Sequence, residues 1–433
     1  MTLSAQHPTP HEPAKAVHAP SPGWTLRFPL TVVICLVAPS HAAFGQEALR
    51  NSLAGEAAAT QLRRQLENAP YSAQWGDLKL LAEPSLSMDW NDNVLYSDLR
   101  QQEDIILRPL LNLTTLYPIG QRNALKFSTG IGYEQYFKHD EYSRFLVQPG
   151  SELSLDFFIK DVRLNFHDRF SYEQDPGLLG EVSNVAKFGG IYNTAGTSAT
   201  WDFKDLLLNA GYDYFKFISA SSGYDYLNRD AHQLVARAGL QVHPTAVVGL
   251  ELAGGPTYYD QSYLNDNMGA SIGGYAQWQA TEHISVRPRA GYALYTFTSN
   301  PYAAPDDFNA YYFGLRMIHQ INPKIDYTLD AGRQIQPSAY ANLLDLWTAS
   351  VQANWRFIKD VSLFTRVFYE HGEQAASYYS EKFDRVGASV GVGYRLLEKL
   401  TSRLDYRLLI KNSDLAPNDY TQNRVTVGVT YRF

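Results

Sequence analysis

Apolar and polar residues alternate with a period of two along most of the chain. In the final stretch, apolar residues at 425, 427, 429, 431 and 433 alternate with Thr, Gly, Thr and Arg. Successive side chains of a β-strand point to opposite faces, so each such strand has one apolar and one polar face. The same pattern recurs at 153–159, 347–357 and 386–395. It predicts an antiparallel sheet from about residue 78 to the C-terminus.

Two features separate this pattern from that of a soluble sandwich. The alternating segments run about 10–13 residues, whereas soluble strands usually have about 5–6 and tilted transmembrane strands about 9–11. Aromatic residues such as Trp347 and Phe357 lie at the ends of the apolar faces, as in interfacial girdles. Because only a closed barrel satisfies the backbone of strands in hydrocarbon, we expect an all-β, transmembrane, antiparallel up-and-down β-barrel.

The spacing of turn residues predicts the number of strands. Short turns are expected near 118–122, 160–161, 204–205, 243–245, 281–283, 321–324, 359–360 and 397–399. Longer loops are expected near 94–103, 138–143, 173–187, 218–230, 261–267, 299–307, 337–345, 371–382 and 411–419. These links predict about 18 strands, with 16 as the alternative if one hairpin is misassigned. Both ends of the barrel then lie on the short-turn side, which is periplasmic in such barrels.

The N-terminal region has the pattern of an export signal. Lys15 and Arg27 precede the apolar stretch 28–38, and small residues follow at 40–42 and 43–45. Such a stretch is too short to span a membrane and fits a signal-peptide core. The sequence therefore predicts a signal peptide over residues 1–45. The only cysteine, Cys35, lies within it, so the mature chain would contain none.

Residues 46–77 connect this signal to the first long strand. Leucines at 49 and 53, and again at 62 and 66, are spaced for one helix face, although Gly55 interrupts the segment. A short periplasmic helical segment is expected here. It could act as a solvated tether, as a docking helix or as a plug of the barrel lumen.

Some positions within the expected strands break the regular pattern. Prolines occur at 84, 109, 149, 256 and 288, mostly on the lipid-facing parity. Because proline removes one ladder hydrogen bond, these positions are interpreted as bulges. Asp168 would also face lipid by strict parity, so a register shift is predicted near it.

Composition narrows the class of protein further. The chain has 433 residues, 45% of them hydrophobic and 19% charged, with a mean hydropathy of −0.30. This content argues against disorder, and no apolar run is long enough for a membrane helix. The net charge of −7 argues against a nucleic-acid partner.

Strand parity places many charged residues on the inner face, where arginines outnumber acids. The candidate pore-lining residues are Arg163, Arg169, Arg237, Arg287, Arg289, Arg316, Arg356, Arg366, Arg395, Arg403, Arg407, Asp326, Asp330, Glu370 and Asp405. Arginine matches carboxylate and phosphate geometry, so one interpretation is an anion-leaning pore, suited to acidic sugars. The other is that Arg–acid pairs between strands hold the wall together.

Two further features of the lumen are predicted. The 173–187 loop is the longest and contains Pro176, Gly177 and Gly180, so it is a candidate for folding inward as a constriction. Inner aromatic residues at 295, 364 and 368 could form a track on which sugar rings stack. Packing near a barrel rim is the alternative role for these rings.

No pattern of catalytic residues emerges. His139 lies in a loop, His319 and His371 lie at strand ends, and none of these, nor His167, is linked to a nucleophile at a recognisable spacing. Metal-binding, phosphate-binding and dinucleotide motifs are also absent from the sequence. The sequence therefore predicts a protein that is not an enzyme and uses no cofactor or metal.

The chain ends in Val429, Tyr431 and Phe433 on one strand face, which resembles the C-terminal signal that outer-membrane barrels present to their insertion machinery. More narrowly, the segments LRPLLNL at 107–113 and VRPRAGY at 286–292, the Gly-Tyr strand endings and the final TYRF resemble the β-barrel porins associated with exopolysaccharide loci. The resemblance covers about residues 78–433.

This resemblance implies a Gram-negative outer-membrane barrel, with membrane lipids and the insertion machinery as partners. It implies a porin-like channel for small solutes, or export of an acidic exopolysaccharide. The alternative is a structural or docking barrel whose lumen is occluded and which transports nothing itself.

Overall fold

The computed structural model describes residues 71–120, 123–301, 305–377 and 380–433. The predicted signal peptide and residues 46–70 of the predicted tether lie outside these ranges. Within the described ranges, no helix has the length and apolar character needed to cross a membrane.

Almost all of the described chain is β-strand, interrupted by four short 3-10 turns. The strands are β1 Ala73–Trp75, β2 Leu78–Asn91, β3 Asp104–Ile119, β4 Asn123–Tyr136, β5 Arg144–Ile159, β6 Val162–Glu173, β7 Gly190–Asp202, β8 Leu206–Ser219, β9 Arg229–His243, β10 Ala246–Tyr259, β11 Asn267–Gln279, β12 Ile284–Phe297, β13 Phe308–Asn322, β14 Ile325–Gln336, β15 Leu343–Ile358, β16 Val361–Ala375, β17 Lys382–Leu397, β18 Leu400–Ser413 and β19 Tyr420–Tyr431. The 3-10 turns are η1 Asp140–Tyr142, η2 Pro176–Leu178, η3 Ser222–Leu227 and η4 Ala416–Asn418.

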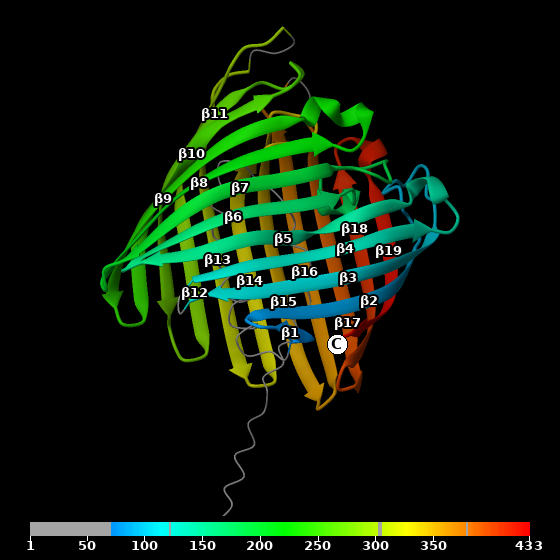
Figure 1. Cartoon of the computed structure of the whole chain (residues 1–433). Coiled ribbons are helices and arrows are strands. Elements are labelled where there is room, and N and C mark those ends of the chain that lie inside the picture. Colours follow the sequence, from blue (N-terminus) through cyan, green and yellow to red (C-terminus); the bar gives the residue numbers. More distant parts are fainter. Residues whose placement is uncertain (1–70, 121–122, 302–304, 378–379) are drawn as a thin grey trace, which may run out of the picture. The chain divides into compact units, whose positions relative to one another are not determined.

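Each long strand pairs antiparallel with its neighbours in sequence, and the last pairs with the first long strand (Figure 1). The closing β19–β2 pairing runs from Arg424 opposite Asn91 to Thr430 opposite Ser85. The sheet has 19 strands, of which β1 is a three-residue addition, so β2 to β19 form a closed 18-strand up-and-down barrel. This confirms the predicted fold class and strand count and excludes the 16-strand alternative.

The predicted alternation of short turns and longer loops is also confirmed. Each of the eight predicted short turns falls between consecutive strands, and each of the nine loops joins the other strand ends. The pair Lys-Asp recurs in the short turns, and in two of these turns Lys160 and Lys204 adopt positive φ angles of 54° and 67°. A left-handed residue of this kind matches the twist of a tight hairpin.

Strand β1 lies in the segment that the sequence pattern assigned to the tether. It pairs with Leu78–Leu80 of β2. The pairing of β19 with β2 ends at Ser85, so this N-terminal part of β2 has no partner in β19. The backbone N–H of Phe433 donates to Ala82 O at 3.3 Å between the two. Because unpaired strand edges are costly in a membrane, β1 completes the wall where β19 ends.

The wall is apolar outside and polar inside, the reverse of a soluble protein. The outward side chains of Leu250 and Ile272 are 64% and 58% exposed, whereas the inward Asp89 is fully buried. Such a surface is stable only against hydrocarbon.

The interpretation of the strand prolines as bulges is mostly wrong. Pro84, Pro109 and Pro288 pair in register with Leu111, Leu86 and Leu315 of a neighbouring strand. Pro256 pairs in register with Met268, so Pro149 is the one of these five prolines that lies at a register shift, between Val147 and Ser151. In an antiparallel sheet, alternate residues of a strand form their backbone hydrogen bonds with the strand on one side and with the strand on the other side. A proline therefore removes a single backbone hydrogen bond to one neighbouring strand, and the register of both pairings is kept.

The register shift predicted near Asp168 does occur, in the β5–β6 pairing next to Phe170, but it does not turn Asp168 inward. All residues from Val162 to Glu173 pair with β7 without interruption, and the shift lies in the neighbouring strand β5. Asp168 therefore keeps its outward parity between Phe166 and Phe170, which are both exposed. A carboxylate on the lipid-facing side of a barrel is uncommon and often functional.

Candidate pore and its constriction

Strand register places all the predicted pore-lining residues on the inner face of the barrel. They are Arg163, Arg169, Arg237, Arg287, Arg289, Arg316, Arg356, Arg366, Arg395, Arg403, Arg407, Asp326, Asp330, Glu370 and Asp405. Their predicted effect on solute passage stays a prediction.

Most of these arginines form ion pairs. The pairs are Arg163–Asp156 at 3.0 Å, Arg169–Glu152 at 3.8 Å, Arg237–Glu251 at 3.1 Å, Arg316–Asp330 at 2.6 Å, Arg356–Asp326 at 3.9 Å, Arg395–Asp360 at 3.9 Å, and Arg403–Asp405. All of them except Arg403–Asp405 join residues of neighbouring strands or their connecting turn, which is the wall-stabilising role considered from the sequence. The paired arginines are therefore not free to bind solutes.

Four inner arginines form no ion pair with any acid in the described parts of the chain: Arg287, Arg289, Arg366 and Arg407. All lie between β12 and β18. Arg366 rests over the ring of Phe368, with 5.4 Å from its guanidinium carbon to the ring centroid. Arg407 donates to the neutral Gln422 side chain at 3.1 Å. None of the four lies within ion-pair distance of an acid in the described ranges, although the charge of Arg407 also acts on the carboxylate of Asp175.

The two sides of the lumen differ in accessibility. On β4 and β5, Lys126 and Asp156 pair at 3.2 Å and both are buried. On β13 and β15, the side chains of Arg316 and Arg356 are 55% and 40% exposed. The accessible inner surface is thus the arginine-rich side, which we call the basic wall (inner residues of β12–β18).

The 174–189 loop between β6 and β7, a candidate constriction from the sequence with an ordinary surface loop as the alternative, folds inward. At its base, Arg144 donates to the carbonyls of Gln174 at 2.7 Å and Ala186 at 2.9 Å. The carboxylate of Asp175 accepts a hydrogen bond from the Tyr96 hydroxyl at 2.7 Å. These contacts fix both ends of the loop to the inner face.

The middle of the loop reaches β17 and β18, far around the barrel. Arg385 on β17 donates to Gly177 O at 2.9 Å. Lys411 on β18 donates to Glu181 O and Ser183 Oγ, each at 3.1 Å. Both anchors are inner-face residues with buried side chains. The loop therefore reaches from β6 to β18 and β17, six and seven strands away through the closing seam, and narrows the lumen.

Apolar packing holds the same loop in place. Val182 and Phe188 pack in a buried cluster with Phe215 and Phe217 of β8 and Ala339 of the 337–342 loop. Val182 has no exposed surface. Burial of these side chains stabilises the folded-in position, because each buried apolar side chain contributes about 1.5–3 kcal/mol.

The charge of Asp175 strengthens the anchor. Burial opposes its ionisation, but the guanidinium groups of Arg407, Arg144 and Arg424 outweigh burial and hold the pKa of Asp175 well below its usual range. The carboxylate is therefore ionised at any physiological pH, and the loop carries a permanent negative charge towards the inner arginines.

Glu181 behaves in the opposite way. Its carboxylate accepts hydrogen bonds from Ser338 Oγ at 2.5 Å, Ala339 N at 2.8 Å and Gln374 Nε2 at 3.3 Å. Burial nevertheless raises the pKa of Glu181, and the charge of Glu381 acts in the same direction. The folded-in loop thus favours the protonated acid.

We expect channel conductance to fall on acidification. Above the raised pKa, the folded-in loop holds an ionised Glu181, and burying that charge weakens its docking. Below the ordinary value of 4.5 the acid is protonated whether or not the loop is docked, and this penalty is absent. Docking of the loop therefore strengthens as the pH falls from the raised pKa to 4.5. Single-channel recordings between neutral and acidic pH test this. Glu181→Gln should flatten the dependence; a conductance that rises on acidification would contradict it.

Sequence reasoning missed the charged network at the closing seam. Asp89 on β2 is fully buried and binds Arg108 at 2.7 Å and Arg424 of β19. Arg108 also binds Glu134 at 2.7 Å, which in turn binds Arg144 at 2.5 Å. Arg424 could have been predicted from the sequence, because it lies an even number of positions before the inward Arg432 in the chain.

Of the two roles that the sequence left open for the inner aromatic residues, packing is the one that their contacts favour. Tyr295 is buried in a cluster with Ile335. The ring of Phe364 is covered by Arg403, 3.9 Å from the guanidinium carbon to the ring centroid, and Phe368 is flanked by Arg366 and Arg385. Glycines beneath these rings let them lie flat: a Cβ at Gly391 would come within 1.8 Å of Phe364. The rings brace the wall and leave no face for a sugar.

The histidines have structural partners. His139 contacts the Asp104 carboxylate at 2.9 Å, and His371 contacts Asp384 at 2.9 Å, both near the loop ends of strands. On the inner face, His167 contacts Asp213 at 3.0 Å and Asn165 at 2.9 Å. None of these three histidines contacts a serine, cysteine or threonine hydroxyl or thiol through these bonds, whereas His243 contacts Thr245 Oγ1 at 3.0 Å in the exposed β9–β10 turn.

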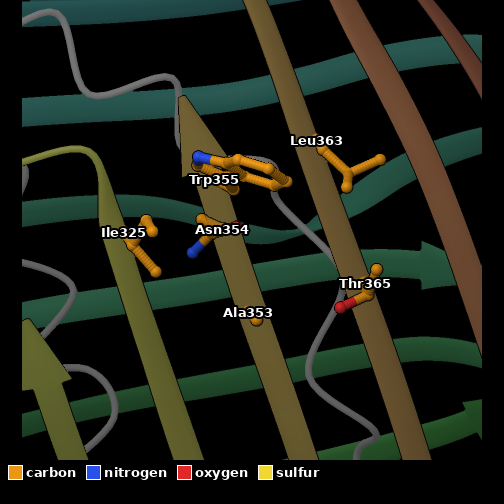
Figure 2. Close-up of a pocket in the computed structure, with 6 residues that line it drawn as sticks. All are labelled: Ile325, Ala353, Asn354, Trp355, Leu363 and Thr365. Atoms are coloured by element: carbon orange, nitrogen blue, oxygen red, sulfur yellow. The ribbon is translucent and has the colours of Figure 1, made fainter. Parts of the chain in front are cut away.

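A hollow on the outer face lies where β14, β15 and β16 approach their short turns. Figure 2 shows Trp355 and Leu363 on neighbouring strands, with the small side chains of Ala353 and Thr365 beside them. Its lining is almost entirely apolar, so it belongs to the lipid-facing surface and not to the pore.

The predicted assembly signal lies on the outer face at the short-turn end. Val429, Tyr431 and Phe433 are exposed, and the last two rings meet edge to face with centroids 5.0 Å apart. Between them, Arg432 points inward and binds Glu83 at 2.6 Å. Recognition of this end by the insertion machinery stays a prediction.

An 18-strand closed barrel with an apolar exterior and a charged lumen is an outer-membrane β-barrel, and the chain is therefore located in the cell outer membrane. The family model described as "Outer membrane protein beta-barrel domain" matches residues 332–433. The search of curated proteins found no match.

Solved structures of porins share the barrel fold. A BenF-like porin from Pseudomonas fluorescens Pf-5 is 10% identical with a TM-score of 0.48, covering 82% of this chain and 99% of its own. OccAB4 of Acinetobacter baumannii is 12% identical with a TM-score of 0.46, covering 82% and 98%. OccK5 of Pseudomonas aeruginosa is 13% identical with a TM-score of 0.46, covering 82% and 98%.

Proposed function

We propose that this protein is a non-enzymatic diffusion channel that favours small anionic solutes. The observation that carries the proposal is the basic wall, where Arg287, Arg289, Arg366 and Arg407 lack an acidic partner within the described ranges. Charged rings at a pore wall set ion preference. Arginine in addition pairs with carboxylate and phosphate through two parallel hydrogen bonds.

The inward loop supports small solutes over a polymer. It crosses from β6 to Arg385 and Lys411 and is anchored at several points along its length. A polysaccharide needs a continuous wide passage and a track of free aromatic faces, and the inner rings are covered by arginines. The link to exopolysaccharide export that the resemblance implied finds no support in these contacts.

Neutralising two unpaired arginines should change selectivity. In a planar bilayer under a KCl gradient, the wild type should show a reversal potential of the sign given by chloride preference. Arg366→Gln combined with Arg407→Gln should move this potential towards zero, because both are inner-face charges without an ion pair in the described ranges.

The matched control is Arg333→Gln, which removes the same charge from the outer face. Arg333 pairs there with Asp345 at 2.6 Å and lies over the Tyr311 ring at 4.2 Å. It should leave the reversal potential unchanged. Cation preference in the wild type would contradict the proposal, as would the absence of any conductance.

A further inference from the structure

Asp168 interrupts the lipid-facing surface halfway along β6. The outward rings of Phe166 and Phe170 flank it, and Leu153 is its cross-strand neighbour on β5. In the described ranges its side-chain hydrogen bond comes from a neutral group: Asn193 Nδ2 donates to its carboxylate at 3.0 Å. Within the described ranges, no cationic side chain forms an ion pair with it. Hydrocarbon offers such a carboxylate neither water nor a hydrogen-bond donor.

Polar groups continue from Asp168 across the next three strands. Strand register aligns Asp168 with Ala195 on β7, Tyr214 on β8 and His232 on β9. One step along, Lys216 binds Asp230 at 2.8 Å, and Tyr214 donates to the same carboxylate at 2.7 Å. We name this set the outer polar stripe: Asp168, Asn193, Tyr214, Lys216, Asp230 and His232.

The stripe has two different edges. Its β6 edge carries only the acceptor oxygen atoms of Asp168. Its β8–β9 edge carries Lys216, whose ammonium has further N–H donors beyond the one given to Asp230, beside Tyr214, which donates to Asp230, and the imidazole of His232. Between them, the outward residues of β7 include the small Ala195, Thr197 and Ala199. Small residues permit close approach between membrane-embedded surfaces.

The geometry points to a second copy of this chain as the occupant of the stripe. We propose that barrels associate side by side through the outer faces of β6–β9, so that Asp168 of one copy accepts hydrogen bonds from the donor edge of the other. When two copies pack about an axis parallel to the barrel axis, the left edge of one face meets the right edge of the other. An acceptor edge and a donor edge on one face are complementary under that operation.

Cysteine cross-linking in outer membranes tests the proposal. Because Cys35 is the only cysteine, a Cys35→Ser background leaves single engineered sites. Ala195→Cys lies in the stripe on β7, and Ala349→Cys is the matched control on the outer face of β15, far around the barrel. A short bis-maleimide should link Ala195→Cys into a band of twice the monomer mass, several-fold more than Ala349→Cys.

A second variant links this result to the carboxylate. Asp168→Leu should lower the Ala195→Cys cross-linking several-fold while the barrel keeps its heat-modifiable migration on gels, because it removes the acceptor and adds an apolar group. Asp168→Asn, which keeps an acceptor oxygen, should retain more cross-linking.

Each other outcome overturns the proposal. Equal cross-linking at both sites means random collision, and none at either means that the stripe faces lipid. A product of any mass other than a multiple of the chain means a different partner. Unchanged yield in Asp168→Leu means that the carboxylate has no role in association. All these results are independent of whether the channel favours anions.

Discussion

Removal of the 174–189 loop should raise single-channel conductance several-fold. Glu173 and Gly190 are opposite each other at the ends of β6 and β7, so a two-residue Asn-Gly turn can replace the loop without disturbing the strands. An 18-strand barrel without an inward segment encloses a wide aqueous channel. The loop is anchored on both sides of the lumen through Arg144 and Lys411, and its loss opens that cross-section.

Planar-bilayer recordings of the shortened barrel measure this effect. Shortening the 137–143 loop, whose η1 turn has no buried residue, is the control and should leave conductance near the wild-type value. If removal of 174–189 changes nothing, the loop does not set the narrowest point. If only the shortened barrel conducts, the occluded docking barrel is the better description of the wild type.

Asp89→Asn should lower the free energy of unfolding by about 3–5 kcal/mol, the usual effect of breaking a buried ion pair. Asp89 is fully buried and is shared by Arg108 of β3 and Arg424 of β19. The neutral amide removes the counter-charge that Arg108 and Arg424 share at the seam where the barrel closes. Arg108 is then left with Glu134 alone and Arg424 with Asp175 alone. Urea unfolding in detergent micelles, followed by tryptophan fluorescence, measures the difference.

The comparison variant makes the same substitution at an exposed pair. Asp330 binds Arg316 at 2.6 Å, but the two side chains are 37% and 55% exposed. Exposed pairs contribute about 0–1 kcal/mol, so Asp330→Asn should unfold close to the wild type. Equal losses in the two variants would show that burial of the seam network is not what stabilises closure.

The strand count and the inside-out surface could be predicted from the sequence because both are local. A period of two is fixed by the geometry of each strand, and turn residues such as the repeated Lys-Asp pairs at 160 and 204 mark the corners. The inner parity of the arginines follows from the same rule. The same rule does not predict which of these arginines lack an acidic partner, because an ion pair depends on the register between strands.

Exceptions to local rules were the least predictable features. Proline at 109 or 288 suggests a break, yet two neighbouring strands hold the backbone in register. Asp168 suggests a shift, yet its continuous pairing with β7 keeps it outward. In both cases a ladder of many hydrogen bonds outweighs the preference of one residue.

The sequence by itself determined that this chain forms a closed barrel with its apolar surface outside, since the alternation of apolar and polar residues and the strand length depend only on residues close together in the sequence. Only the tertiary structure decided how the lumen is filled. The crossing of the 174–189 loop to Lys411, the joining of Asp89 to Arg424 and the pairing of all but four predicted inner arginines depend on residues far apart in the chain. Closure of the barrel brings these residues together, and a pattern of neighbouring residues cannot predict contacts between residues that are far apart in the sequence.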